Sequence, residues 1–205
     1  MSFDLKLHAY RLLMDEPFFA ALSRKIEKRA STAIPTAGVR VCPDTAQFEM
    51  IYNPDFFDSL PEEQVKGVLK HEFYHLIFEH VTSRRPEGVN HKVWNICADL
   101  AINSHLVGEL PDNCCMPGVG PFEGLPKGES AEWYLANFPE RPEGEGEGEG
   151  EGEPGEGSGE GSGEGESFDD HSGWSEDGDS PAQEAANQMA KERLKQGMKE
   201  AAKEA

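Results

Sequence analysis

The chain has 205 residues, a formal net charge of −20 and no continuous run of 18 apolar residues. This length is typical of one domain with a tail, and without a long apolar run we expect no membrane-spanning helix. The acidic balance lacks the basic footprint of most nucleic-acid-binding proteins, so we also expect no nucleic-acid partner.

The cysteines and the first residues bear on the cellular compartment. The four cysteines form no C-x-x-C pair, and their spacing is unlike a secreted disulfide framework. Residues 1–6 are charged early and lack the apolar core of a signal peptide. We therefore expect a cytoplasmic protein.

Two amphipathic helices are predicted at the start of the chain. The first covers residues 4–14, and the second starts at Pro17, a residue favoured in the first turn of a helix. We expect the basic run 25–29 to end the second helix, because cations favour helix C-termini.

A small antiparallel hairpin is predicted next. The stretches 38–41 and 47–52 are β-prone, and Pro43-Asp44 between them is typical of a turn. Residues 55–60 are then expected to form a short connector.

A long helix from Pro61 to about Ser83 carries the sequence H-E-x-x-H. His71 and His75 are one turn apart, so both imidazoles project from the same face and can bind one Zn²⁺ at about 2.0–2.1 Å. Glu72 is rotated by about 100° from His71 and can reach a water activated by the metal without binding the metal.

A chance motif on an exposed helix is the simpler explanation of this sequence. With 7 histidines and many glutamates, a random H-E-x-x-H has a probability on the order of a few per cent. The helix, however, is apolar around most of its circumference, which predicts a buried helix. Burial of two histidines and a glutamate is costly unless they are paired or bind a metal, so we favour the metal site. The apolar residues are Val65, Val68, Leu69, Phe73, Tyr74, Leu76, Ile77 and Phe78.

The next predicted helix, Val93 to Leu106, offers a third ligand. Asn95, Asp99 and Asn103 form a polar stripe on an otherwise apolar helix. In one explanation, Asn95 and Asn103 bond to loop backbone and Asp99 pairs with an Arg. In the other, this face of the helix is directed at the metal. His80 is an alternative ligand, but on a continuous helix it would lie about 140° from the metal face. We therefore predict Asp99, since carboxylate oxygen is an ordinary zinc ligand.

These blocks resemble a known family. Val68–His75 and Trp94–Asn103, with Asn53-Pro54, His80 and Arg84-Arg85, are similar to the predicted HExxH metallopeptidase domain associated with von Willebrand factor A-like proteins of bacteria and phages. The resemblance covers roughly residues 10 to 110.

The resemblance implies an α+β, zincin-like fold with zinc held by His71, His75 and Asp99. True gluzincins have a ligand Glu followed one turn later by an Asp that supports a histidine. Asn95 and Asp99 occupy that spacing here. If Asp99 is the supporting residue, the third ligand lies elsewhere.

The end of the chain has a different composition. A short helix at Ser130–Leu135 closes a domain over residues 1–138. Residues 139–180 are Gly- and Glu-rich, and we expect a disordered acidic linker because this composition buries no core. Residues 181–205 are predicted to be a helix that needs a partner surface, for example on another protein.

Within the linker, His171 lies in an isolated Asp-x-His-x-x-Trp island. We expect either an incidental histidine or a segment that folds back and stabilises a developing oxyanion, which makes His171 a candidate catalytic residue. Arg84, Arg85 and His91 are alternatives for the same role.

The function predicted from these features is zinc-dependent hydrolysis of peptide or amide bonds in a peptide or protein substrate. Zinc would activate the water, and Glu72 would act as the general base. The alternative is a non-catalytic zinc-stabilised binding, assembly or regulatory module, in which the metal serves folding only.

Overall fold

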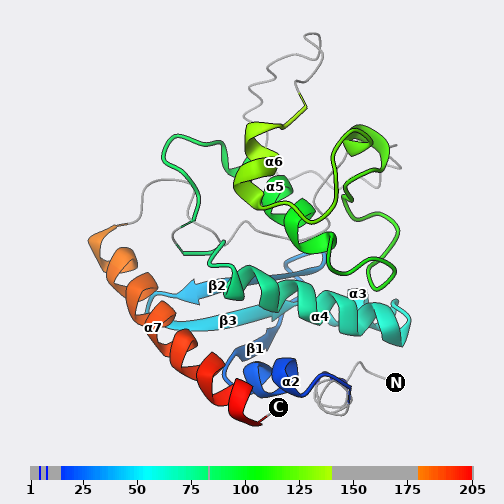
Figure 1. The fold of residues 1–205 in the computed structure, drawn as a ribbon. Coiled ribbons are helices and arrows are strands. Elements are labelled where there is room, and N and C mark those ends of the chain that lie inside the picture. The colour runs from blue at the N-terminus through cyan, green and yellow to red at the C-terminus, as the bar shows by residue number, and fades with distance from the viewer. Residues whose placement is uncertain (1–4, 6–7, 9–14, 83, 140–179, 205) are drawn as a thin grey trace.

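A three-stranded sheet with strand order β1-β3-β2 lies among the helices, which pack around it (Figure 1). The computed structural model describes residues 5, 8, 15–82, 84–139 and 180–204. The fold is mixed α+β, as the sequence predicted. Strands β2 (Ala37–Cys42) and β3 (Gln47–Tyr52) form the predicted antiparallel hairpin.

Strand β1 (Glu27–Ala30) corrects the prediction that the basic run 25–29 ends a helix. Helix α2 (Pro17–Ser23) stops earlier, and β1 pairs in parallel with β3. The amine of Lys28 donates hydrogen bonds to the carbonyls of Ser23 and Ile26, which ties the strand to the end of α2. Backbone pairing with a distant strand outweighs the local preference of charged residues for a helix end.

The expected connector at residues 55–60 also contains a helix, α3 (Pro54–Asp58). Asn53 caps it by accepting a hydrogen bond from the amide of Asp55 at 3.0 Å. Pro54 in the first turn has the backbone φ that a helix start requires.

The two helices that carry the motif residues have different bounds from those predicted. Helix α4 (Glu62–Ile77) ends six residues before Ser83, at a turn in which Glu79 has a φ of 60°. Helix α5 (His91–Asn103) starts directly after its N-cap residue Asn90. The side-chain oxygen of Asn90 accepts hydrogen bonds from two backbone amides of the first turn. The predicted short helix near the end of the domain is α6 (Ala131–Ala136).

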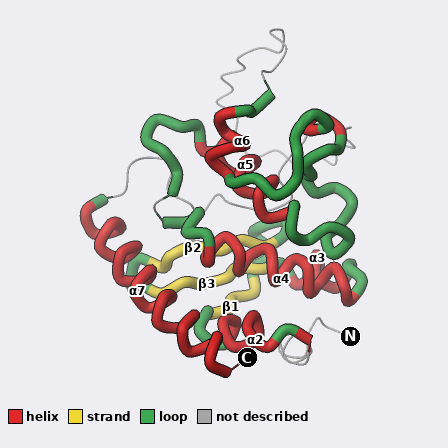
Figure 2. Tube along the Cα trace, viewed as in Figure 1, coloured by secondary structure: helices red, strands yellow, loops and turns green. Residues whose placement is uncertain are grey.

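The two motif helices belong mainly to two different apolar clusters. The first joins the sheet to α2, α4 and one face of a C-terminal helix, and the second joins α5 to α6 and to the loops between them. Figure 2 shows that the connection from α5 to α6 is almost entirely loop, apart from the short 3-10 helix η1 (Gly120–Phe122). The packing of α4 and α5 therefore joins the two clusters.

Helix α7 (Pro181–Glu204) coincides with the predicted C-terminal helix. Ala186, Ala190 and Leu194 are buried in the first cluster, and the helix runs along α2 and the sheet (Figure 1). Arg193 donates to the carbonyls of Thr45 and Ala46 in the hairpin turn. The surface that this helix needs is thus provided by the same chain.

Two further predictions fall largely outside the described residues. These are the first helix, of which only Leu5 and His8 are described, and the linker 140–179 with His171. Among the described residues, none of the helices combines the length and the hydrophobicity that a membrane span requires.

Candidate metal centre

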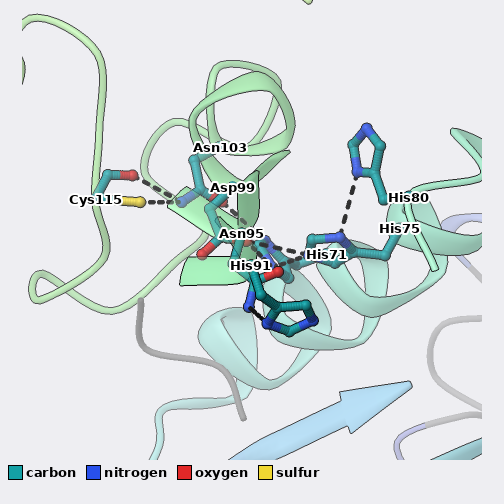
Figure 3. A network of polar contacts seen from close by, with 8 residues as sticks. All are labelled: His71, His75, His80, His91, Asn95, Asp99, Asn103 and Cys115. Carbon is teal, nitrogen blue, oxygen red and sulfur yellow. Dashed lines mark hydrogen bonds and ion pairs between the residues drawn. The ribbon is translucent and has the colours of Figure 1, made fainter. Parts of the chain in front are cut away.

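Three potential ligand atoms converge where α4 crosses α5. His71 and His75 come from α4 and Asp99 comes from α5, and Figure 3 shows the three side chains directed toward one another. One ligand atom of each lies within 4.8 Å of the others, and all three residues are completely buried.

The separations of these atoms suit a small divalent cation. Nε2 of His75 lies 2.8 Å from Nε2 of His71 and 3.2 Å from Oδ1 of Asp99, and the third separation is 3.6 Å. A triangle of this size has a point roughly 2 Å from each corner, which matches zinc–nitrogen and zinc–oxygen bonds. The geometry therefore fits a metal held by two imidazoles and a carboxylate.

The protonation of His71 follows from its neighbours. The side-chain amide of Asn103 donates to the carbonyl of Cys115 at 2.7 Å, so its Oδ1 faces Nδ1 of His71, at 2.8 Å. An amide oxygen only accepts, so Nδ1 of His71 carries a proton, and in the neutral ring Nε2 is the nitrogen that can bind a metal. This is the arrangement by which metal-binding histidines are usually oriented.

The three side chains have the chemistry of metal ligands. Nε2 of His75 lies close to both Nε2 of His71 and Oδ1 of Asp99. A divalent cation between them would be bound by all three atoms. The donor set thus fits a metal on chemical grounds as well as by distance.

Comparison with known proteins gives the family. A family model described as "Putative metallopeptidase domain" matches residues 2–205. The chain belongs to this metallopeptidase family. Within this family chain, His71, His75 and Asp99 form a cluster that could hold a metal ion.

One similar curated protein comes from Thermotoga maritima and is named there as an uncharacterized protein. It is 27% identical over 62 residues, which cover 30% of this chain and 16% of the relative. The chain thus spans a small part of that relative's length. No solved structure matches this metallopeptidase-family chain.

Glu72, the predicted general base of this metallopeptidase-family site, follows His71 directly on α4. Its side chain is completely buried, and both carboxylate oxygens are shielded from solvent. Burial of a carboxylate is costly, so its position beside a cation site is electrostatically favourable.

Four residues were predicted as candidates to stabilise an oxyanion: Arg84, Arg85, His91 and His171. Nε and Nη2 of Arg84, which form one edge of the guanidinium, donate to the carboxylate of Glu132 on α6 at 2.5 and 2.9 Å, so this side chain is engaged in a structural contact. Arg85 donates to the carbonyl of Val89, and His91 contacts Asn95 at 3.2 Å. His171 lies outside the described residues.

Sequence reasoning missed two histidine partners in this metallopeptidase-family site. Asn103 was predicted on the polar face of its helix, but its bond to His71 was not predicted. Both explanations of the polar stripe apply to Asn103, because it bonds to loop backbone at Cys115 and also to His71. His80 was placed away from the site, but its Nδ1 lies 3.3 Å from Nδ1 of His75. That error arose because α4 was assumed to continue past Ile77.

Proposed function

We propose that this chain is a zinc-dependent peptidase that hydrolyses peptide or amide bonds, with zinc held by His71, His75 and Asp99. The observation that carries the proposal is the convergence of three buried potential ligand atoms, with separations of 2.8, 3.2 and 3.6 Å. Membership of a metallopeptidase family supports peptide hydrolysis as the chemistry.

A bound zinc ion supplies Lewis acidity, which polarises a substrate carbonyl and lowers the pKa of a water molecule. Glu72 would take the proton of the water that adds to the carbonyl carbon and would give it to the amine that leaves as the C–N bond breaks. Glu72 follows His71 directly on α4, and it is not part of the His-His-Asp cluster.

Zinc is favoured over iron by the motif rather than by the ligands alone. Two histidines and a carboxylate also bind Fe(II) in oxygenases that keep several open positions. A glutamate directly beside the first histidine on the same helix is instead the arrangement of hydrolytic zinc sites, where that residue handles protons.

The ligand arrangement also supports a zincin-like class. In gluzincins, a ligand Glu is followed one turn later by an Asp that supports a histidine. Asp99 and Asn103 have this spacing, with Asp99 at the cluster and Asn103 bonded to His71. The pair resembles the gluzincin pair, moved one turn along the helix from Asn95 and Asp99.

A second candidate function is a metal clip that stabilises the domain without turnover. It is favoured by one observation, the complete burial of His71, Glu72, His75 and Asp99. A structural site is closed, whereas a catalytic site keeps one position for water and substrate.

The Glu72→Gln variant separates these two functions. Glutamine keeps the shape of the side chain but does not accept the proton, so a peptidase should retain zinc while hydrolysis falls by roughly 10²–10⁴-fold. Elemental analysis measures the zinc, and mass spectrometry of a broad peptide library measures cleavage. Glu63→Gln, an exposed change on the same helix, is the matched control and should behave as wild type.

Three results would count against the peptidase. Equal cleavage by wild type and Glu72→Gln removes Glu72 from the mechanism, and cleavage by neither protein favours the metal clip. Undiminished zinc in a His71→Ala/His75→Ala double variant or in Asp99→Asn shows that the metal binds elsewhere.

A further inference from the structure

His80 reaches the metal centre because of the way α4 ends. The amide of Glu79 donates to the carbonyl of Leu76, and the amide of His80 donates to the carbonyl of His75, both at 3.0 Å. With Glu79 in the left-handed region at a φ of 60°, these bonds form a Schellman motif. This motif brings the residue after the turn against the last helical turn, so the His80 ring contacts the His75 ring.

The His75–His80 contact has a defined donor when His75 binds a metal through Nε2. The proton of a neutral His75 then resides on Nδ1, which lies 3.3 Å from Nδ1 of His80. His80 accepts this hydrogen bond and carries its own proton on Nε2. The contact therefore selects the form of His75 whose electron pair faces His71 and Asp99.

The acceptor is held in place by aromatic neighbours. His80 is only 3% exposed. Its ring packs edge-on against Trp94, with centroids 5.9 Å apart, and against the His75 ring at 5.4 Å, and it is tilted against Phe78 at 5.7 Å. A buried ring with three aromatic contacts has little rotational freedom, which gives the hydrogen bond a fixed direction.

The turn itself is attached to the C-terminal helix. Non-glycine residues pay roughly 1–2 kcal/mol for a left-handed backbone. The carboxylate of Glu79 binds Lys191 at 2.8 Å and Lys195 at 3.4 Å, both on α7. The Lys191 ammonium also holds the pKa of Glu79 below its usual value. These ion pairs favour the strained turn over a continued helix.

We propose that His80 is a positioning residue of the metal centre, acting through Nδ1 of His75, and that α7 holds the turn that carries His80. The inference rests on the proposed role of His75 as a metal ligand. It connects residues 75, 80 and 191 into one chain of contacts from the metal centre to the C-terminal helix.

Two nearly isosteric substitutions test the hydrogen bond. His80→Asn places an amide oxygen where Nδ1 was, and His80→Leu has the same branched shape without an acceptor. Both lose the imidazole packing, so their difference reports the hydrogen bond. We expect His80→Leu to weaken zinc binding by about 10–100-fold and His80→Asn to recover most of this loss.

The measurements are zinc affinity, by competition with a chelator, and the ¹⁵N chemical shifts of the His75 imidazole. Zinc-loaded wild type and His80→Asn should show a hydrogen-bonded proton on Nδ1 of His75, and His80→Leu should show that signal shifted or in exchange. Equal affinity of His80→Leu and wild type, or of the two variants, overturns the role of His80. A wild-type protein that binds no zinc instead overturns the proposed function.

A second pair of variants, one test and one control, examines the role of α7. Lys191→Ala/Lys195→Ala removes the ion pairs to Glu79. Lys25→Ala instead removes an ion pair of 2.8 Å between the turn that follows α2 and Glu200 on α7. The double variant should weaken zinc binding by about 2- to 5-fold, the weight of exposed ion pairs, and Lys25→Ala should not change it. Equal affinities in all three proteins overturn the link between α7 and the turn.

Discussion

Asn103 shows how a single amide organises the centre. Its nitrogen donates to the carbonyl of Cys115 and its oxygen accepts from His71, so one side chain joins α5, the following loop and α4. Both of its partners are buried, and a buried polar group that loses its partner costs about 1–3 kcal/mol. The position of the His71 ring therefore depends on a residue that never touches the metal.

Replacement of Asn103 by Leu keeps the side-chain shape and removes both hydrogen bonds. We expect zinc affinity to fall by roughly 10–100-fold and the free energy of unfolding of the zinc-free protein to fall by about 1–3 kcal/mol. Chelator competition and urea denaturation measure the two effects. Asn137→Leu, at an exposed amide that bonds only within its own helix end, is the control and should change neither quantity. Unchanged zinc affinity in Asn103→Leu would show that His71 needs no support.

At the scale of the helices, Gly67 sets the distance between α4 and the loop after α5. A Cβ atom built on Gly67 would lie 1.9 Å from the carbonyl oxygen of Glu109, which is far inside van der Waals contact. The amine of Lys70, one turn further along α4, binds the carboxylate of Glu109 at 2.5 Å. The absence of a side chain at residue 67 thus lets the loop pack directly on the helix that carries the histidines.

Replacement of glycine by alanine should lower the unfolding free energy at Gly67 in α4 and raise it at Gly197 in α7. Gly67→Ala must displace the backbone at Glu109, and overpacking of this kind costs about 1–3 kcal/mol of unfolding free energy. At Gly197 the nearest atom to a new Cβ is Cγ of Lys25, at 3.5 Å, an ordinary contact. Gly197→Ala should therefore stabilise the protein by about 0.5–1 kcal/mol through helix propensity. Thermal melts of both variants test this, and destabilisation by both would contradict the role assigned to Gly67.

The elements differ in how far the sequence could predict them. The motif helix and the β2–β3 hairpin were predictable because periodicity and turn residues are local signals. Strand β1 was not, since its pairing with β3 involves residues about 22 positions away, as in Glu27 with Glu49. The end of α4 was not predicted for a related reason. No nearby residue indicates that Glu79 has a left-handed backbone conformation, and the lysine that pairs with Glu79 is on α7. His80 was misplaced with it, whereas Asp99 depended only on helical spacing.

At the scale of the whole molecule, the candidate centre lies between the two apolar clusters. Helix α4 belongs to the cluster around the sheet, and most of α5 packs with α6 in the other. His71 and His75 come from one helix and Asp99 from the other, so a bound metal would join the two clusters. Without a metal, the junction has only the contacts among these three side chains, at 2.8, 3.2 and 3.6 Å.

Removal of the metal should therefore loosen α5 more than the sheet. At a free zinc concentration 100 times the dissociation constant, binding adds about 2.7 kcal/mol, which corresponds to a rise in melting temperature of roughly 5–10 °C for a domain of this size. Thermal melts with zinc and with a chelator measure the stabilisation. Hydrogen exchange should show that chelation lowers the protection of amides in α5 while those of β2 and β3 change less. The His71→Ala/His75→Ala variant is the control, and zinc should alter neither its melting temperature nor its exchange. Equal melting temperatures of the wild type with and without zinc would show that the metal does not join the two clusters.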